Sequence, residues 1–213
     1  MRISAVVVAA GRGERFGSQK QFLSFGEHSV AATSVAAARS VASEVILVVP
    51  EGYQGSGEGA DRTVCGGATR SASVRNGLAS VASADIVVIH DAARPLASAQ
   101  LFRAVVAAIV DDVIGAVPAL DVTDTVKLVE RGSLTRVVGT VDRSALVTVQ
   151  TPQAFRFQDL LNAHNESCDA TDDAALLEAR GALIVTVAGE ASNIKITTPE
   201  DWARVRELAG SAS

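Results

Sequence analysis

Mostly apolar segments without polar alternation constrain the fold of this chain most strongly. Two of them read VILVV and IVVI, a pattern typical of strands covered on both faces of a sheet. Alternating strands and alanine-rich helices predict a doubly wound α/β fold with a mainly parallel sheet and right-handed crossovers. The strands are expected at residues 5–9, 45–49, 62–65, 86–89 and 113–117. The helices between them are expected at residues 29–42, 70–81 and 99–110.

The segment from residue 121 to residue 150 departs from this alternation. Strand-like DTVKLVE is followed by a polar turn at Arg131-Gly132-Ser133 and then by LTRVV and SALVTVQ, with little helix between these pieces. This pattern predicts an antiparallel excursion built on a hairpin, which protrudes from the main sheet as a β-arm at about 121–150.

The C-terminal part returns to alternating helices and strands. Helices are expected at residues 158–165 and 172–179, and a strand at 183–187. Pro199 then opens a final helix, with Thr198 as its N-cap. The sequence has no repeats and no clear domain boundary, so we expect a single domain over residues 1–213.

Composition limits the class of protein. A hydrophobic fraction of 48% with 20% charged residues supports a core and argues against disorder. The formal net charge of −5 argues against general nucleic-acid or anionic-membrane binding. Cys65 and Cys168 form no CxxC pair, and the N-terminal apolar run at 5–10 is too short for a signal sequence or a membrane span. We therefore expect a soluble cytoplasmic protein.

Glycines alternate with cations directly after the first expected strand, at Gly11, Arg12, Gly13, Arg15, Gly17 and Lys20. Glycines let backbone N–H groups approach an anion, and the cations add charge where a phosphate chain would lie. The alternative is a strand-to-helix turn with solvated cations, which spacing alone does not exclude. Neither the dinucleotide G-x-G-x-x-G motif nor a P-loop is present, which leaves a longer cationic loop around a nucleoside triphosphate.

A second candidate lies in His90-Asp91-Ala92-Ala93-Arg94-Pro95, where another expected strand ends. Ligands of open parallel sheets bind outside the carboxyl ends of the strands, and an Asp there can hold Mg²⁺. Alternatively, Asp91 caps a turn and pairs with Arg94. His90 is expected to pack or form hydrogen bonds rather than to bind a metal.

Two further stretches have polar groups at expected sheet ends. After Gly66-Gly67, backbone groups and Ser73 are placed to read the edge of a base, whereas Thr69 or Ser71 is expected to cap the following helix. Lys195 is expected inside a short strand between two isoleucines. It either faces solvent at a sheet edge or turns inward towards an anion.

Four stretches together resemble one family: AAGRGER…KQ at 9–21, GGATRSASV at 66–74, HDAARP at 90–95 and NIKITTPEDW at 193–202. They are similar to the 2-C-methyl-D-erythritol 4-phosphate cytidylyltransferase family, with matches in order over essentially the whole chain. The resemblance implies a Rossmann-like nucleotidyltransferase fold. Supporting matches lie at 124–125, 140–143, 150–155 and 171–173.

The family resemblance implies a reaction as well as a fold. CMP passes from CTP to the polyol phosphate 2-C-methyl-D-erythritol 4-phosphate, giving 4-diphosphocytidyl-2-C-methyl-D-erythritol and pyrophosphate in non-mevalonate isoprenoid synthesis. Mg²⁺ is the implied cofactor, and the implied partner is a second copy of the chain. In that homodimer each β-arm crosses to the neighbouring active site.

The resemblance also implies roles for individual residues. Catalytic roles fall to Arg15, Lys20 and Lys195. Nucleotide contacts fall to Ala9, Ala10, Gly11, Gly13, Gly67, Arg70, Ser73, Asp91 and Ala92, and Asp91 also holds the metal. Acceptor contacts fall to Arg94, Thr125, Arg143, Thr151, Thr171 and Lys195, with Arg143 reaching across the dimer.

The sequence departs from the family pattern at two places. The interval from Arg15 to Lys20 is shorter than is common, and Gln19 stands where a proline is frequent, so a different loop conformation is expected. Ala68 stands where an Asp is frequent, which removes any contact from that side chain.

Three other functions stay open at this level. A ribitol-5-phosphate cytidylyltransferase would share the nucleotide motifs and differ only in its acceptor pocket. A non-catalytic nucleotide-binding regulatory module need not keep Arg15, Lys20, Asp91 and Lys195 together. A nicotinamide oxidoreductase is disfavoured by the glycine spacing.

Overall fold

A computed structural model describes residues 1–11, 13, 15–166 and 172–210 of the chain. Its main sheet has eight strands in the order β10-β7-β11-β6-β1-β4-β5, with β12 on the other edge of β7. The strands are β1 Ile3–Val8, β4 Glu44–Val49, β5 Arg62–Cys65, β6 Ile86–Asp91, β7 Gly115–Asp121, β10 Val147–Val149, β11 Gln153–Arg156 and β12 Ile184–Ala188.

Most of these strands are parallel. The pairs β1–β4, β1–β6, β4–β5 and β7–β12 are parallel, whereas β11 runs antiparallel to β6 and β7. The doubly wound, mainly parallel sheet predicted from the sequence is confirmed. The mixed centre arises because the chain returns from the arm through β10 and β11 without a crossover helix.

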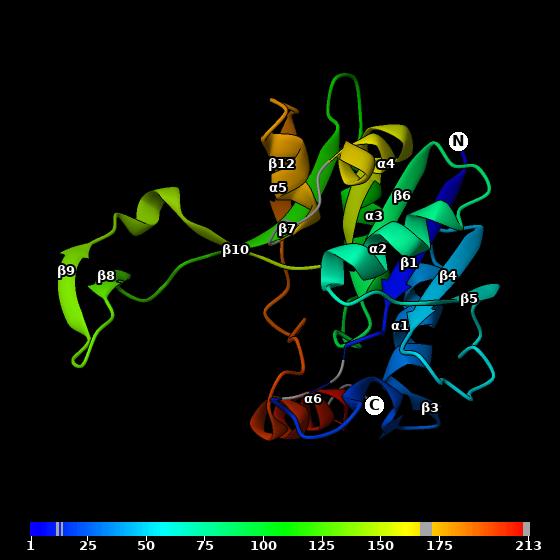
Figure 1. Cartoon of the computed structure of the whole chain (residues 1–213), viewed down its shortest axis with the longest axis horizontal. Helices are drawn as coiled ribbons and strands as arrows, with labels where there is room; N and C mark the ends of the chain where they lie inside the picture. Colours follow the sequence, from blue (N-terminus) through cyan, green and yellow to red (C-terminus); the bar gives the residue numbers. More distant parts are fainter. Residues whose placement is uncertain (12, 14, 167–171, 211–213) are drawn as a thin grey trace.

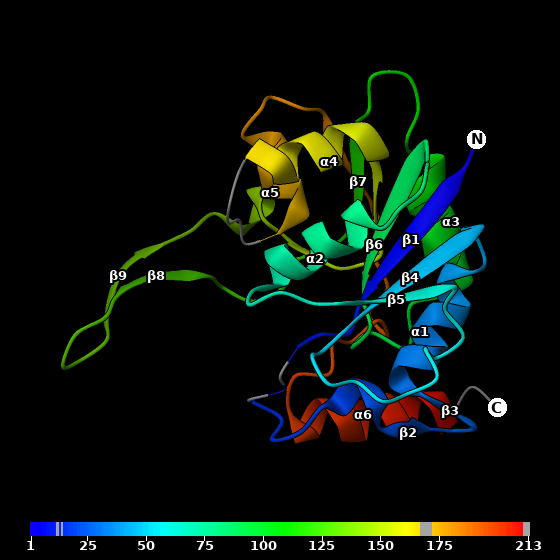
Figure 2. The ribbon, with the colours of Figure 1, turned by 45° about the vertical axis from the view of Figure 1, so that its right-hand side comes forward.

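Helices cover both faces of the sheet (Figure 2). Helices α1 Val30–Ala38 and α3 Ala99–Ala107 lie on one face. Helices α2 Arg70–Ala79, α4 Phe157–Glu166 and α5 Asp173–Glu178 lie on the other. Successive residues of one strand point to opposite faces, so Ala5 and Val7 join the first core and Val6 joins the second. Both cores are apolar, which explains the missing alternation.

A third, smaller core anchors the C-terminal helix. Helix α6 Pro199–Gly210 lies beside the short hairpin of β2 Ser24–Phe25 and β3 His28–Ser29 (Figure 1). The rings of Phe25 and Trp202 are 5.9 Å apart. The hydroxyl of Thr198 accepts a hydrogen bond from the backbone N–H of Asp201 at 3.3 Å, which confirms the predicted cap.

The predicted hairpin is present and projects far from the main sheet (Figure 1). Strands β8 Lys127–Glu130 and β9 Arg136–Thr140 pair antiparallel with each other. The excursion is shorter than predicted, because β10 already pairs with β7 in the main sheet. The expected arm strand at SALVTVQ is therefore divided between a 3₁₀ turn, Arg143–Ala145, and β10.

Two local predictions were wrong. The segment around Lys195 is not a strand, because its backbone pairs with no described strand: the N–H of Ile196 bonds the carbonyl of Ala93, beyond the end of β6, at 2.8 Å. Helices α1, α2 and α3 end before the predicted residues 42, 81 and 110. Ala42 and Val81, which lie beyond the ends of α1 and α2, are buried from turns rather than from helix, whereas Val110, beyond α3, is 53% exposed.

In the part of the chain that the structure describes, no helix combines the length and the apolar character needed to cross a lipid bilayer.

Helix α2 lies so close to the sheet that its residue 77 must be glycine. A Cβ on Gly77 would be 2.4 Å from Cγ1 of Val6 and 3.0 Å from Cγ2 of Val48, and both valines are fully buried. We expect Gly77→Ala to lower the free energy of unfolding by about 1–3 kcal/mol, because overpacking outweighs the gain in helix propensity. Urea unfolding would measure this.

Gly210→Ala is the matched control for that substitution. Gly210 also belongs to a helix, but a Cβ there would meet no atom of the other described residues within 4 Å. Its stability should equal or exceed that of the parent chain. A Gly77→Ala protein as stable as the Gly210→Ala protein would contradict the close packing of α2.

Candidate functional site

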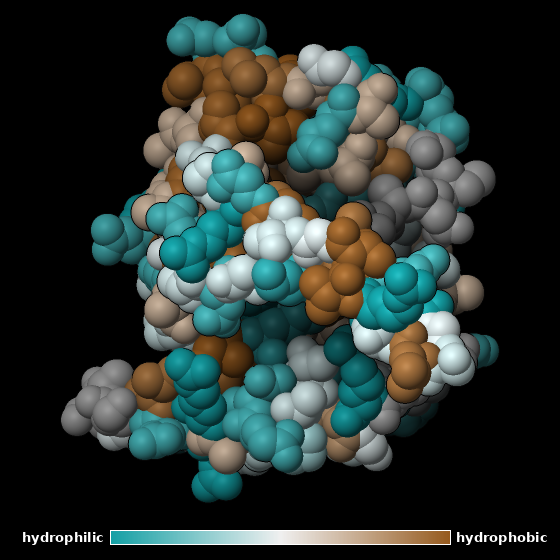
Figure 3. All heavy atoms as spheres, turned by 90° about the vertical axis from the view of Figure 1, so that its left-hand side faces the viewer, coloured by the Kyte–Doolittle hydropathy of each residue, from teal (hydrophilic) through white to brown (hydrophobic). Residues whose placement is uncertain are grey.

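A cavity of about 520 Å³ lies at the carboxyl ends of β1 and β6. Hydrophilic residues surround a hollow on the side of the molecule from which the arm projects (Figure 3). The cavity brings together most of the residues predicted to bind the nucleotide or to act in catalysis. Those that line it are Ala9, Ala10, Gly11, Gly13, Arg15, Lys20, Gly67, Arg70, Ser73, Asp91 and Lys195.

Asp91 is the electrostatic centre of this cavity. It is the last residue of β6, and its side chain is only 9% exposed. One carboxylate oxygen lies 3.1 Å from Nε of Arg70, and the other lies 2.6 Å from Nζ of Lys195. The carboxylate of Asp91 therefore does not pair with the guanidinium of Arg94, as one alternative from the sequence suggested, although the N–H of Arg94 bonds the carbonyl of Asp91 in a turn at 3.0 Å. Lys195 is turned towards an anion, and that anion is Asp91.

These ion pairs keep the charges of the cavity fixed. Burial acts to raise the pKa of Asp91, but the charges of Arg70 and Lys195 outweigh it and hold that pKa well below its ordinary value. Burial likewise acts against the charge on Arg70, yet Asp91 and Asp173 raise its pKa above the ordinary value. A buried carboxylate is tolerated here because cations surround it.

The first glycine-rich loop follows β1 directly. Gln21, in the 3₁₀ turn Lys20–Phe22, donates from Nε2 to the carbonyls of Ala9 at 2.7 Å and Gly11 at 3.0 Å. Gly13 has φ +71°, a conformation that favours glycine, and it lines the cavity. Gln21 thus holds the loop in place, a role that the sequence did not suggest.

Lys20 is placed at this cavity by the same short turn, despite the shortened interval from Arg15. Burial lowers the pKa of Lys20, and the charges of Arg15 and Lys195 lower it further. Three cations thus lie near one another in the cavity. Such mutual repulsion is relieved when an anion enters.

The second loop precedes helix α2 and is shaped by its two glycines. A Cβ on Gly66 would lie 2.3 Å from Cβ of Ala10, and one on Gly67 would lie 2.4 Å from Cβ of Ala72. The hydroxyl of Ser73 accepts from the N–H of Gly67 at 3.1 Å. The same hydroxyl donates to the carbonyl of Thr69, so Ser73 ties this loop to the helix.

Thr69 caps helix α2 by accepting a hydrogen bond from the N–H of Ala72 at 3.0 Å, which confirms one of the two predicted caps.

His90 is fully buried and packs on the ring of Phe102, with 5.0 Å between centroids. Burial lowers the pKa of His90 to about 4, so this side chain is neutral at neutral pH. Its predicted packing role fits this position.

Two residues predicted to bind the acceptor substrate, Thr151 and Arg94, do not line the cavity but form hydrogen bonds with residues beside it. The hydroxyl of Thr151 accepts from the N–H of Asp91 at 3.0 Å, and the peptide bond that follows Thr151 is cis. Arg94 donates from Nη1 to the carbonyl of Asn193 at 2.7 Å. Ala92 is fully buried and does not line the cavity, whereas Ala93 does.

Side-chain amides fix the segment that carries Lys195. Asn193 is fully buried and donates to the carbonyl of Thr151 at 2.9 Å. Gln150 bonds the backbone of Glu190 through both ends of its amide, at 2.8 Å and 3.0 Å. The sequence motifs contained Gln150 and Asn193, but nothing in them indicated that they hold Lys195 near Asp91.

Two other predicted residues are not brought to the cavity of this chain. Thr125 and Arg143 are exposed on the arm, where Arg143 donates to the carbonyl of Thr123. Thr171 lies outside the described residues. The sequence analysis gave no role to His164, nor to Asp173 beyond its place in the match at 171–173, yet both are buried beside Arg70.

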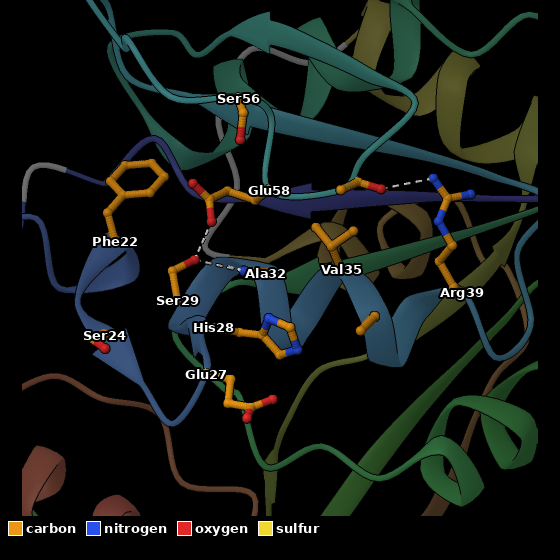
Figure 4. Close-up of a pocket in the computed structure, with 12 residues that line it drawn as sticks. Phe22, Ser24, Glu27, His28, Ser29, Ala32, Val35, Arg39, Ser56 and Glu58 are labelled. Atoms are coloured by element: carbon orange, nitrogen blue, oxygen red, sulfur yellow. Dashed lines mark hydrogen bonds between the residues drawn. The ribbon is translucent and has the colours of Figure 1, made fainter.

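A larger hollow, of about 790 Å³, lies beside helix α1 and the loop that carries Ser56 and Glu58 (Figure 4). Several of the polar side chains that line it are already paired. Ser29 donates to Glu58, Tyr53 donates to the same carboxylate at 2.9 Å, and Arg39 pairs with Asp61 at 2.9 Å. We therefore assign the chemistry to the smaller cavity, where charges converge on open space.

Comparison with known proteins shows the family of the chain. The family model described as 2-C-methyl-D-erythritol 4-phosphate cytidylyltransferase matches residues 3–209. A protein of that name from Cereibacter sphaeroides (strain ATCC 17023) is 40% identical over 100% of this chain and 99% of its own length. A bifunctional enzyme IspD/IspF from Anaeromyxobacter sp. (strain Fw109-5) is 43% identical over 97% of this chain, which spans 57% of that relative.

Solved structures give the same result. The crystal structure of 2-C-methyl-D-erythritol 4-phosphate cytidylyltransferase from Thermus thermophilus matches with a TM-score of 0.80 and 36% identity, over 96% of this chain and 98% of that one. The bifunctional IspDF from Campylobacter jejuni matches with a TM-score of 0.78 and 26% identity, over 96% of this chain and 54% of that one. The chain belongs to the 2-C-methyl-D-erythritol 4-phosphate cytidylyltransferase family.

Proposed function

We propose that the chain transfers CMP from CTP to 2-C-methyl-D-erythritol 4-phosphate, giving 4-diphosphocytidyl-2-C-methyl-D-erythritol and pyrophosphate. Family membership supports the reaction. The observation that carries it is the cavity itself, where Arg15, Lys20 and the Asp91 ion pairs surround space at the ends of parallel strands. This is where open α/β sheets bind nucleotides.

The chemistry is a direct displacement at phosphorus. An oxygen of the acceptor phosphate attacks the α-phosphorus of CTP, a new P–O bond forms, and the bond to the pyrophosphate oxygen breaks. The cavity holds no side-chain nucleophile paired with a base among the described residues that line it. Catalysis then depends on positioning and on stabilising the charge that develops on the leaving group.

Electrostatic repulsion between the two substrates is the first obstacle. Two unit charges about 4 Å apart repel by roughly 4 kcal/mol at an effective dielectric constant near 20. Arg15, Lys20 and Lys195 supply positive charge near the phosphates in this proposal. The lowered pKa of Lys20 supports this role, because its charge lacks compensation until an anion arrives.

The backbone around the cavity would hold the nucleotide. Ala9, Ala10, Gly11 and Gly13 line the cavity in the loop that Gln21 fixes, and we assign the triphosphate to this loop. The second loop, with Gly67, would lie against the cytosine.

Mg²⁺ is part of the proposal, with Asp91 as its ligand. No three or more His, Cys, Asp or Glu side chains gather into a possible metal site among the described residues. A single carboxylate fits Mg²⁺ when substrate phosphates and water complete the coordination. Both oxygens of Asp91 carry an ion pair, so Lys195 would yield one of them. Bound Mg²⁺ would neutralise charge on the phosphate oxygens.

The acceptor side of the proposal requires a second copy of the chain. Thr125 and Arg143 lie on an arm that projects away from the cavity of its own chain (Figure 1). The arm also exposes apolar side chains, with Leu128 58%, Leu134 79% and Val137 64% exposed. A homodimer in which each arm covers the neighbouring site would bury these side chains and deliver Arg143.

Location and other partners remain predictions from the sequence: a cytoplasmic protein that binds neither nucleic acid nor membranes. The acceptor is decided by a pyrophosphate-release assay that crosses CTP, ATP, GTP and UTP with methylerythritol phosphate and ribitol 5-phosphate, with and without Mg²⁺. We expect release only with CTP, methylerythritol phosphate and Mg²⁺. Release with ribitol 5-phosphate instead would establish the alternative acceptor, and CTP binding without release would indicate a regulatory module.

Substitutions should separate the triphosphate loop from the arm. We expect Lys20→Ala and Arg15→Ala to lower kcat about a hundredfold, because they remove charge that stabilises the transition state. Arg143→Ala should mainly raise KM for the acceptor, by about tenfold, because it removes a charged contact to the phosphate. Steady-state kinetics of the folded variants measures both, and near-normal turnover of Lys20→Ala would remove Lys20 from the mechanism.

Mixed dimers test whether the arm crosses to the other subunit. A dimer of one Lys20→Ala and one Arg143→Ala subunit has one site with both residues intact if the arms cross. At low acceptor concentration, mixing the two variants should therefore give more activity than either alone. Activity equal to the average of the two would place each arm with its own site.

The pH profile should report Lys20. Its pKa lies below the ordinary value of 10.5, mainly because of burial, so its charge is lost as pH rises through that lowered value. We expect kcat/KM for CTP to fall on this alkaline limb. Lys20→Arg should move the limb to higher pH, because a guanidinium keeps its charge. An alkaline limb at the same pH in active Lys20→Arg protein would show that another group titrates.

A further inference from the structure

A buried ionic network continues behind the wall of the cavity. Asp173 is the first residue of α5 and only 1% exposed. One of its carboxylate oxygens lies 2.8 Å from Nη1 of Arg70, and the other lies 3.0 Å from Nε2 of His164, whose side chain is fully buried. Arg70 thus bridges two carboxylates, Asp91 inside the cavity and Asp173 behind it.

His164 orients the second carboxylate. Among the described residues its Nδ1 is buried without a hydrogen-bond partner, while Nε2 faces Asp173. A bare lone pair on Nδ1 costs less than a buried N–H without an acceptor, so the proton belongs on Nε2, which donates to Asp173. Burial acts to raise the pKa of Asp173, but the bonds from His164 and Arg70 outweigh it and lower that pKa.

Arg70 needs more than one carboxylate to hold its place. It is the first residue of α2, where the helix dipole repels a cation. Asp91 contacts it only through Nε, and Lys195 holds the other oxygen of Asp91. A contact at Nη1 as well fixes the plane of the guanidinium group. Asp173 supplies that contact from a different helix.

We propose that Asp173, oriented by His164, is a positioning residue that sets Arg70 for cytidylyl transfer. The inference rests on the proposed function, in which Arg70 lies against the nucleotide. Asp173 itself lies outside the cavity lining and acts through Arg70. Without it, Arg70 keeps its charge, but its guanidinium group loses its fixed orientation and its Nε–H contact with Asp91 opens more often.

The first experiment measures the orientation of Arg70 directly. The protein is labelled with ¹⁵N-arginine, and the Nε–H signal of Arg70 is assigned by its loss in Arg70→Lys. In the parent chain this signal should exchange slowly with water, because Nε–H donates to buried Asp91. In Asp173→Asn it should shift and exchange at least about tenfold faster. An unchanged signal would overturn the proposal.

The second experiment measures turnover. We expect Asp173→Asn to lower kcat/KM for CTP by about tenfold to a hundredfold, the range for losing one hydrogen bond between charged groups. In an Arg70→Gln background, Asp173→Asn should cause no further loss, because its effect passes through Arg70. Equal losses in both backgrounds would show that Asp173 is merely structural.

Controls separate positioning from folding. Arg180→Gln removes a tie between α4 and the turn after α5, the 2.6 Å pair of Arg180 with Glu166, without touching Arg70, and should leave kcat/KM unchanged. If Asp173→Asn does not fold, His164 provides the test. His164→Gln keeps an amide N–H in place of Nε2–H and should stay within about threefold of the parent, whereas His164→Phe should lose about tenfold. Equal activity of these two variants would overturn the proposal.

The activity of the parent chain distinguishes a failure of the proposed function from a failure of the positioning role of Asp173. If it releases no pyrophosphate from CTP with either polyol phosphate, the proposed function is wrong, and the Arg70 signal still decides whether Asp173 holds that side chain. If the parent chain is active and Asp173→Asn retains full turnover with an unchanged signal, the positioning role alone is wrong.

Discussion

The buried carboxylate of Asp91 is the interaction on which the rest of the site depends. A charged group at the end of a central strand is costly to bury, and it persists only where cations reach it. Those cations come from distant parts of the chain, Arg70 from the start of α2 and Lys195 from the segment before α6. Asp91 thereby joins the sheet, the second loop and the C-terminal segment into one cavity.

The sequence predicted what depends on local pattern. Unbroken apolar runs indicated a sheet covered on both faces, and glycines after β1 and β5 indicated loops with exposed backbone. It did not predict the partner of Asp91, because Arg94, only three residues away, instead bonds the carbonyl of Asn193. Nor did it predict His164 and Asp173, whose meeting with Arg70 requires α4 and α5 to pack beside α2. Such contacts arise from tertiary packing, so no characteristic spacing of residues in the sequence indicates them.

The arm shows the same division between local and distant information. The turn at 131–133 made the hairpin predictable. A single chain, however, does not show which surface the exposed side chains of the hairpin contact. Leu134 is 79% exposed at the tip, and exposed apolar side chains gathered in one place mark an interaction surface. The proposed acceptor residues on the arm and the cavity are separate in one chain, so the complete site is a property of the dimer in this proposal.

The cations of the cavity divide into two groups with different tasks. Arg70 and Lys195 are already paired with carboxylates, so their positions are set before any substrate arrives. Arg15 and Lys20 form no ion pair with the residues that the structure describes, and the lowered pKa of Lys20 reflects burial and its like-charged neighbours. Groups fixed in advance need little reorganisation during the reaction. Unpaired cations gain most from an incoming polyanion, so in the proposed reaction the paired group shapes the cavity and the unpaired group draws the phosphates into it.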